Sequence, residues 1–232
     1  MSKNQQPMPA AADQQEAMRV QRILDGLARL YPDAQCELNH SNPFELLVAT
    51  VLSAQSTDVR VNQVTEKLFK KYATPEAFAA LTPDILAEEI KELGLYRNKA
   101  KHLVALAQQL IEKHGGEVPD DRESLEALPG VGRKTANVVL STAFGVPAIA
   151  VDTHVFRVAR RLGLASAETP LAVEKELMAA IPKELWTKSH HRLIRHGRRI
   201  CAARRPRCEI CPLFADCRYA QQENTVDAIR AH

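Results

Sequence analysis

Four of the five cysteines in this 232-residue chain lie close together near its end, in a pattern suited to metal binding. They follow the spacing Cys-x6-Cys-x2-Cys-x5-Cys, formed by Cys201, Cys208, Cys211 and Cys217. An odd number of cysteines does not suit a disulfide framework, whereas four clustered thiolates can hold either zinc or an iron–sulfur cluster. The spacing alone leaves both metals open. Cys36 stands apart and is expected to be an ordinary buried thiol.

A second chemical feature is a glycine turn that contains Gly130 and Gly132 and is followed by Arg133. The turn lies between two predicted helices, at 121–127 and 133–144. Two glycines two residues apart allow a tight turn whose backbone amides point outward. These amides begin the next helix, and phosphate binds well at a helix N-terminus. Because backbone would make the contact, DNA would be held without its sequence being read. An ordinary connector between two helices is the alternative interpretation.

Lys134 and Asp152 are the candidates for catalysis. Lys134 lies in the first turn of its predicted helix, where the positive helix end favours the neutral amine that a nucleophile requires. A phosphate contact is the alternative role for this lysine. Asp152 follows a short apolar run and is suited to cap the helix that comes next. A carboxylate held rigidly there can also stabilise a nearby cationic transition state.

Positive charge is concentrated in residues 188–207, although the formal net charge of the whole chain is only +3. This segment holds eight Lys or Arg residues, three histidines and no carboxylate. A local basic patch is typical of a nucleic-acid-binding protein. A solvated charged surface would give the same pattern.

The elements that must position these residues are predicted to be helices. With 45% apolar and only 5% aromatic residues, the chain can bury a core but lacks the material of a β-sandwich or barrel, so we predict an all-α fold. About ten helices are expected, and the only strand-like run is 146–151. Four helix starts are marked by a capping residue before a proline, at Asn42, Thr74, Thr82 and Thr169. Glycines are expected to end helices at Gly94, Gly115, Gly145 and Gly163.

The predicted organisation has a central domain, a second domain made from two separate segments, and two tails. The first helix is expected to begin near Glu16. No stretch approaches the ~20 apolar residues of a membrane helix, and the N-terminus lacks the apolar segment of a signal peptide, so we expect a soluble intracellular protein. The predicted boundaries are 1–15 for the N-terminal tail, 36–146 for the central domain with its hairpin at about 121–144, 16–35 with 147–218 for the second domain, and 219–232 for the C-terminal tail.

In their order and spacing, the hairpin with Lys134, the segment from Val151 to Val155 and the four-cysteine loop resemble the endonuclease III family of DNA glycosylase/AP lyases. The segments Leu52 to Asp58 and Gly94 to Ala100 also match, so the resemblance covers most of the chain. It implies the helix-hairpin-helix DNA glycosylase fold, with a six-helix barrel domain, a four-helix iron–sulfur domain and the active site in the cleft between them. It also implies that the cysteines hold a structural [4Fe–4S] cluster.

The resemblance assigns roles to individual residues of a base excision repair enzyme that removes oxidised pyrimidines and cleaves abasic sites by β-elimination. Lys134 corresponds to the Schiff-base lysine and Asp152 to the catalytic aspartate. Gln55 and Leu95 correspond to residues that enter the duplex and fill the space left by a flipped nucleotide. The remaining expected DNA contacts are Gly130, Gly132, Arg133, His154, Arg204, Arg205 and Arg207.

The implied partner is double-stranded DNA that carries damaged pyrimidines or abasic sites. The protein is expected to be a monomer in the cytoplasm, associated with the nucleoid if it is bacterial, and no membrane is expected to be involved. Two alternatives stay open. One is a related glycosylase of different base specificity, although adenine-mismatch and thymine/uracil glycosylases tend to lack this lysine. The other is a noncatalytic helix-hairpin-helix DNA-binding protein with a structural metal site.

Overall fold

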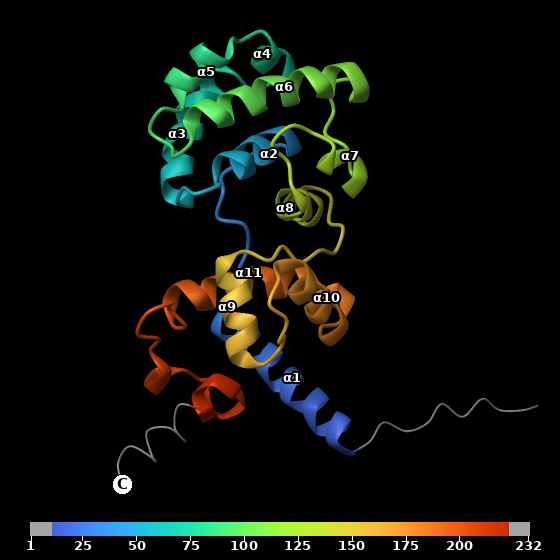
Figure 1. The fold of residues 1–232 in the computed structure, drawn as a ribbon, viewed down its shortest axis with the longest axis vertical. Coiled ribbons are helices and arrows are strands. Elements are labelled where there is room, and N and C mark those ends of the chain that lie inside the picture. The colour runs from blue at the N-terminus through green and yellow to red at the C-terminus, as the bar shows by residue number, and fades with distance from the viewer. Residues whose placement is uncertain (1–10, 223–232) are drawn as a thin grey trace, which may run out of the picture. The chain divides into compact units, whose positions relative to one another are not determined.

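The computed structural model describes residues 11–222, which consist of helices and the loops that join them (Figure 1). No strand occurs in this part of the chain, so the predicted all-α fold is confirmed. Residues 1–10 and 223–232, which belong to the two predicted tails, lie outside the described residues. The described chain divides into two compact units, one made of residues 11–34 and 151–222 and the other of residues 35–150. None of its helices combines the length and hydropathy that crossing a membrane would require.

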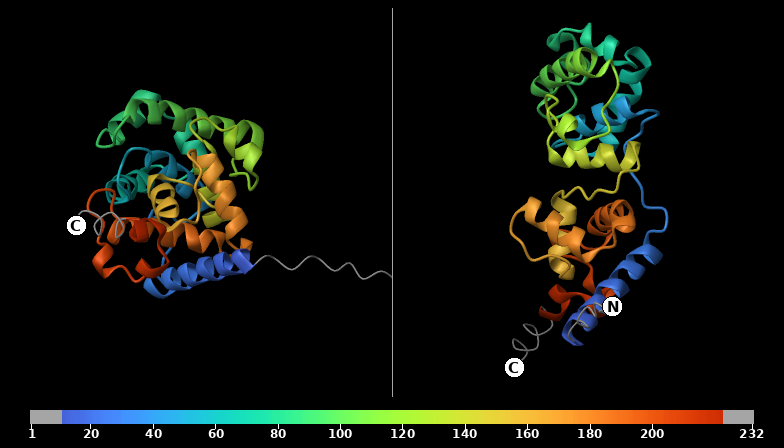
Figure 2. Two further views of the ribbon diagram at one scale, coloured as in Figure 1. Left: turned by 60° about the horizontal axis from the view of Figure 1, so that its bottom comes forward. Right: turned by 90° about the vertical axis from the view of Figure 1, so that its right-hand side faces the viewer.

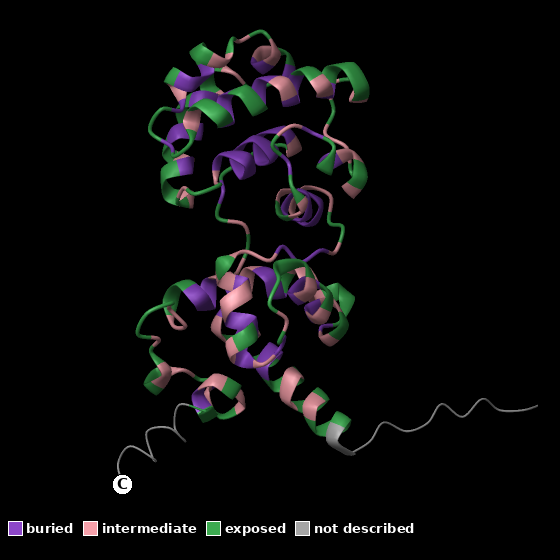
Figure 3. Cartoon of the chain, in the orientation of Figure 1, coloured by how far each residue is buried: buried purple, intermediate pink, exposed green. Residues whose placement is uncertain are grey.

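The unit of residues 35–150 is built around one helix, α2, in which every residue from Phe44 to Leu52 is buried (Figure 3). A helix that is apolar on all sides has to be covered by its neighbours, and α2 packs against α3, α6 and α8. The helices of this unit are α2 (Pro43–Leu52), α3 (Asp58–Lys71), α4 (Pro75–Ala79), α5 (Pro83–Glu89), α6 (Tyr96–His114), α7 (Arg122–Glu126) and α8 (Arg133–Ala143).

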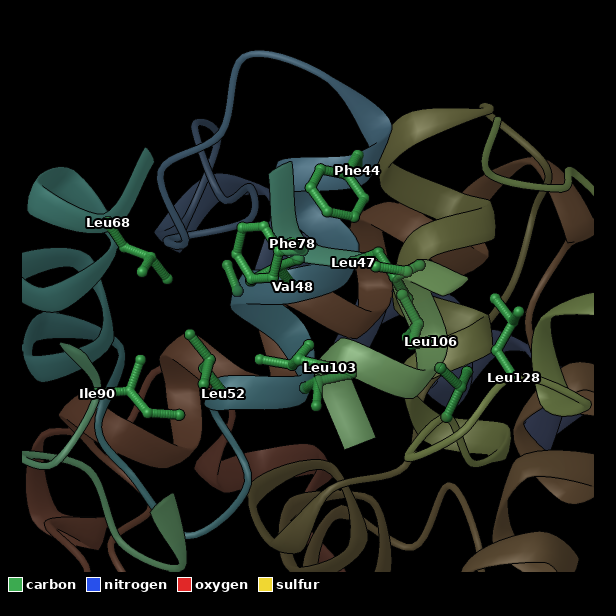
Figure 4. Packing of buried hydrophobic residues seen from close by; sticks show 14 of the residues in the cluster. Phe44, Leu47, Val48, Leu52, Leu68, Phe78, Ile90, Leu103, Leu106 and Leu128 are labelled. Carbon is green, nitrogen blue, oxygen red and sulfur yellow. The ribbon is translucent and has the colours of Figure 1, made fainter. Parts of the chain in front are cut away.

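The core of this unit is formed by side chains from most of its helices (Figure 4). Phe44 and Phe78 meet edge to face with ring centroids 5.3 Å apart, and Leu103 and Leu106 of α6 are fully buried. Each such side chain contributes roughly 1.5–3 kcal/mol by leaving water. The loops at the ends of α2, α6 and α8 are therefore attached to helices that pack in a well-ordered core.

The other unit contains α1 (Ala11–Leu30), α9 (Thr153–Leu162), α10 (Pro170–Ala180) and α11 (Trp186–Arg199), together with three short 3₁₀ helices, η1 (Lys183–Leu185), η2 (Cys208–Ile210) and η3 (Phe214–Asp216). The helix α11 packs against α9 and α1, and α1 lies beside η3 although the two are far apart in the sequence (Figure 2). A Cβ added at Gly26 of α1 would lie 2.4 Å from Leu213 Cδ2. Any larger residue at this position would require the Leu213 side chain to move.

The first helix begins five residues earlier than the sequence pattern predicts, at Ala11 instead of Glu16. Residues 11–15 carry no apolar periodicity, which is why the pattern assigns them to a tail. Alanine and glutamine nevertheless have favourable helix propensities, so these residues extend the helix that follows them.

All four predicted capping side chains are confirmed. Asn42, Thr74, Thr82 and Thr169 each accept a hydrogen bond from the backbone N–H three residues later. Gly115 and Gly163 end their helices in the left-handed conformation, with φ of 61° and 73°. Gly94 does not end a helix, because α5 already stops at Glu89 and Gly94 lies just before α6.

Candidate functional site

The hairpin is the connection between α7 and α8. Val131 N–H donates to the carbonyl of Leu128 at 3.1 Å, and Gly130 has a φ of +77°. With Pro129 before this glycine, these features are typical of a type II turn, whose third residue favours glycine. Gly130 also approaches α6 closely, since an added Cβ would lie 2.9 Å from His102 Cβ. The turn therefore requires glycine at this position for both backbone and steric reasons.

Gly132 is the N-cap of α8, and no side chain caps the start of this helix. An added Cβ at Gly132 would meet nothing within 4 Å, so its surface faces open space. Lys134, the second residue of α8, is exposed. The guanidinium of Arg133 lies 3.8 Å from the carboxylate of Glu126. The hairpin thus presents backbone amides and an accessible amine on one short segment, an arrangement that can take a phosphate beside a nucleophile.

A buried asparagine that sequence reasoning missed fixes α8 within its unit. Asn137 is fully buried, and its Nδ2 donates to the carbonyl of Ile149 at 2.9 Å. Its Oδ1 accepts from the guanidinium of Arg122 on α7. These bonds tie α7, α8 and the chain that follows α8 to one another. The only sequence signal was a polar residue on the apolar side of a helix.

Gln55 and Leu95, for which a shared role is predicted, lie on two loops that contact each other. Both are exposed, and both have left-handed backbones, with φ of 56° and 57°. Leu95 is the N-cap of α6, and its side chain is 54% exposed. A Cβ added at Gly94 would lie 3.3 Å from the carbonyl oxygen of Gln55, so the two loops are in contact. Left-handed conformations cost roughly 1–2 kcal/mol in residues other than glycine, and within residues 11–222 only Gln55, Leu95 and Arg205 adopt one.

Asp152 begins α9 in the other unit. Its Oδ1 accepts the backbone N–H of Val155 at 2.7 Å, so the predicted helix cap is confirmed. Next to it, His154 Nδ1 lies 3.2 Å from a guanidinium nitrogen of Arg157, and burial lowers the pKa of this histidine. The site residues are thus distributed over both units, with Lys134 in residues 35–150 and Asp152 in residues 151–222.

The four predicted metal-ligating cysteines line one common cavity. Burial raises the pKa of the Cys208, Cys211 and Cys217 thiols, and neighbouring cysteines raise it further. A positive metal group would offset this cost by stabilising the thiolates. Within residues 11–222, no three His, Cys, Asp or Glu side chains are arranged to hold a single metal ion. A thiolate-bound group would occupy the cavity that the four cysteines share.

Two side chains that sequence reasoning missed contact the sulfur atoms. His196 is 1% exposed, with Nε2 3.8 Å from Cys211 Sγ and Nδ1 3.1 Å from the hydroxyl of Tyr31. Burial lowers the pKa of His196 to about 4, so the ring is neutral at pH 7. Arg161 Nη1 donates to Cys201 Sγ at 3.5 Å. The cationic donor of Arg161 beside Cys201 suits a ligand set that carries negative charge.

The loop between Cys201 and Cys208 is held by α9 and exposes its arginines. Arg157 Nε donates to the carbonyl of Cys201 at 3.2 Å, and Arg161 donates to that of Ala202 at 2.6 Å. The exposed side chains are Arg204, Arg205 and Arg207. All three side chains are accessible to an anionic partner, while the Arg207 guanidinium also donates to the carbonyl of Arg199.

The basic segment is not a uniform charged surface, and Cys36 is not fully buried. Arg195 is 9% exposed and pairs with Asp33 at 2.9 Å, while His190 and His196 are buried. Only part of residues 188–207 can therefore meet a partner. Cys36 is half-buried at the edge of the core instead of inside it, because it lies in the loop that precedes α2.

Comparison with known proteins first defines a class. Residues 48–183 match the family model of the HhH-GPD superfamily base excision DNA repair proteins. This range contains the helix-hairpin-helix segment, Lys134 and Asp152. The fold and the candidate site thus correspond to those of a helix-hairpin-helix DNA repair protein.

Individual relatives identify the family within this class. Endonuclease III of Bacillus subtilis strain 168 is 55% identical over 207 residues, which cover 89% of this chain and 94% of the relative. Endonuclease III of Escherichia coli K12 is 50% identical over 200 residues, covering 86% and 95%. The chain belongs to the endonuclease III family, and its enzyme class is that of a DNA glycosylase/AP lyase of base excision repair.

Solved structures agree with this assignment. A trapped endonuclease III–DNA covalent intermediate, an estranged-adenine complex, has a TM-score of 0.86 and 54% sequence identity, covering 89% of this chain and 98% of the other. A thermostable thymine-DNA glycosylase has a TM-score of 0.80 but only 26% identity, covering 88% and 98%. The fold is thus shared by glycosylases of different specificity, whereas the sequence is much closer to endonuclease III.

Proposed function

We propose that this protein removes oxidised pyrimidines from double-stranded DNA and cleaves the resulting abasic sites through a Schiff base on Lys134. The observation that carries the proposal is the exposed Lys134 in the uncapped first turn of α8, directly after the glycine hairpin. A hairpin that binds the phosphate backbone would bring this amine to the sugar of the bound strand. The relatives named endonuclease III support the same chemistry.

In the proposed reaction, the damaged nucleotide leaves the base stack, because C1′ of its sugar cannot be attacked inside the duplex. The Lys134 amine attacks C1′, and the bond from C1′ to the base breaks with its electron pair going to the base. The sugar ring then opens to an imine between Lys134 and C1′. The imine acidifies the hydrogens on C2′, and loss of one of these protons expels the 3′ phosphate by β-elimination.

Asp152 is proposed to provide the carboxylate of this reaction. It stabilises the positive charge that develops on the sugar and takes part in removing the proton from the amine. Its hydrogen bond to the N–H of Val155 fixes the carboxyl group at the start of α9. A fixed charge needs little reorganisation when the transition state forms, which is why a helix cap is a suitable position for it.

The four cysteines are proposed to hold a [4Fe–4S] cluster with a structural role. When bound, the cluster would join the two ends of the loop between Cys201 and Cys208 and fix its shape. The cavity that all four cysteines line, and the Arg161 N–H donor beside Cys201, support a thiolate-bound cluster. The exposed arginines of the loop would then contact DNA phosphates.

The remaining DNA contacts are proposed for both units. Gly130, Gly132 and Arg133 would hold the phosphate backbone, and His154 would contact DNA beside Asp152. Gln55 and Leu95 would fill the space left by the flipped nucleotide, for which an amide and an apolar side chain are suitable. The protein is proposed to act as a monomer in the cytoplasm, on nucleoid DNA.

A second candidate function is that of a mismatch glycosylase, because a thymine-DNA glycosylase has the same fold. Lys134 favours the lyase, since a glycosylase that uses water needs no amine nucleophile. The two functions differ in whether base release is followed by strand cleavage.

A product-resolved assay on matched duplexes tests the proposal. The substrates carry thymine glycol, an abasic site, a G·T mismatch or no lesion. We expect base release and β-elimination with thymine glycol, cleavage of the abasic site and no reaction with the other two. Base release from the mismatch without strand cleavage would instead indicate the second candidate. Binding without any product would indicate a noncatalytic DNA-binding protein.

A further inference from the structure

Lys99 is a buried lysine in the first turn of α6 for which neither the fold nor the proposed chemistry gives a role. Only 4% of its surface is exposed, so its ammonium group is not available to a phosphate. Burial without a neighbouring carboxylate lowers the pKa of this lysine. Because burying a cation is costly, the contacts of this group need an explanation.

The ammonium group binds the segment that follows α2. Its Nζ donates to the carbonyl of Leu52 at 2.8 Å and to Ser56 Oγ at 3.2 Å. Leu52 is the last residue of α2, where carbonyls lack helical partners and the helix dipole favours a positive charge. Ser56 directly follows Gln55. The side chain therefore fixes both ends of the short loop that holds Gln55 in its left-handed conformation.

The backbone of Lys99 lies in α6, directly after the loop of Leu95. Its N–H donates to the carbonyl of Leu95 at 3.1 Å, in the first turn of α6. One residue thus contacts the loop of Gln55 through its side chain and the loop of Leu95 through its backbone. The close approach of Gly94 to the Gln55 carbonyl shows that the two loops also touch directly.

A second link between the same segments is weaker. Arg60 and Glu92 form an ion pair at 2.9 Å, but their side chains are 50% and 44% exposed. Such pairs contribute little and are screened by salt. Lys99 therefore provides the buried link between these segments, beside the direct contact of the two loops.

We propose that Lys99 is a positioning residue that joins the loops of Gln55 and Leu95, so that both side chains enter the duplex as one unit. This inference rests on the proposed function, in which these side chains replace the flipped nucleotide. Two separately mobile loops would have to be ordered during insertion, whereas joined loops have lost that freedom beforehand. The role of Lys99 is thus specific to double-stranded DNA, where a space in the stack has to be filled.

The test compares the full-length protein with Lys99→Met and with Lys113→Met, a matched control on the exposed surface at the other end of α6. One duplex carries a tetrahydrofuran abasic analogue opposite 2-aminopurine, whose fluorescence rises when it loses its stacking. The other substrates carry an abasic site in a duplex and in a single strand, and cleavage is measured in single turnover.

We expect Lys99→Met to lose most of the fluorescence rise and to cleave the abasic duplex about 10- to 100-fold more slowly, as misplaced groups do. Cleavage of the single strand should change less than about twofold, because no stack has to be opened. Lys113→Met should behave like the wild type. Lys99→Arg, which keeps charged donors, should recover most of the fluorescence rise.

Equal fluorescence for Lys99→Met and Lys113→Met would overturn the inference, as would equal slowing on the duplex and the single strand. If Lys99→Met does not fold, the inference is tested with Ser56→Ala, which removes one of the two acceptors of the Lys99 ammonium group. A reduced fluorescence rise with that variant supports the inference, and an unchanged rise overturns it. A wild-type protein that cleaves neither substrate would instead refute the proposed function.

Discussion

At the scale of single residues, Asp152 combines a structural contact with a proposed chemical role. Its carboxylate accepts the N–H of Val155 at 2.7 Å and caps α9. A cap needs only a side-chain oxygen, whereas stabilisation of a cationic transition state needs the negative charge. The two roles can therefore be separated by replacing the carboxylate with an amide.

Asp152→Asn should retain the cap and lose the charge. We expect its cleavage rate to fall about 10²- to 10³-fold, while its free energy of unfolding falls by less than about 1 kcal/mol. Single-turnover cleavage and urea unfolding measure the two effects. Asp152→Ala is the control that loses both functions, and it should be about 1 kcal/mol less stable than the wild type. A fully active Asp152→Asn variant would leave this residue with a capping role alone.

At the scale of elements, the two glycines of the hairpin have different functions. Gly130 has a φ of +77°, and an added Cβ would lie 2.9 Å from His102. Gly132 has a φ of −101°, and an added Cβ would meet nothing in the protein. The first glycine is required by the fold, and the second is expected to be required by the approach of a phosphate.

Replacement of each glycine by alanine separates these requirements. Gly130→Ala should lower the free energy of unfolding by about 1–3 kcal/mol because of backbone strain and the contact with His102. Gly132→Ala should change it by less than about 1 kcal/mol but should weaken binding to duplex DNA. Thermal unfolding and a binding titration at fixed salt measure the two variants. Normal DNA affinity of Gly132→Ala would argue against close contact between this residue and a phosphate.

The loop between Cys201 and Cys208 has a fixed backbone and three exposed arginines. If Arg204, Arg205 and Arg207 each neutralise one phosphate, the triple alanine variant should lower the slope of log affinity against log salt by up to about three. Binding should weaken similarly on damaged and undamaged duplexes, because phosphate contacts carry no information about the lesion. An unchanged slope in a variant that retains its cysteine centre would mean that the loop faces solvent.

The elements also show which features a sequence can predict. The cap at Thr82 was predictable because it depends on residues three positions apart. The contacts of Lys99 with Leu52 and of Asn137 with Ile149 were not, because they join segments that meet only after folding. The start of α1 was missed because residues 11–15 have helix propensity but no apolar pattern. The catalytic roles of Lys134 and Asp152 stay predictions that depend on the motifs that contain these residues, because residue type alone left a phosphate contact and a helix cap open.

At the scale of the whole molecule, the cysteine centre joins segments from distant parts of the chain. Tyr31, directly after α1, contacts His196, which in turn lies beside Cys211. Arg22 of α1 pairs with Asp216 at 2.7 Å. We expect the purified protein to be yellow-brown, with a broad absorbance near about 400 nm from a thiolate-bound iron–sulfur cluster. Metal analysis after anaerobic purification provides the control. A colourless, folded protein with one zinc and no iron would contradict the cluster.

The most direct test of the central claim is borohydride trapping on a duplex that contains an abasic site. Borohydride reduces an imine between the protein and C1′ to a stable amine, so only an amine nucleophile leaves a covalent complex. We expect the wild-type protein to be trapped, with the DNA adduct on the peptide that contains Lys134. Lys134→Gln should give no trapped complex and no strand cleavage, while it still binds the duplex. Undiminished trapping by Lys134→Gln would contradict the assignment of Lys134 as the nucleophile.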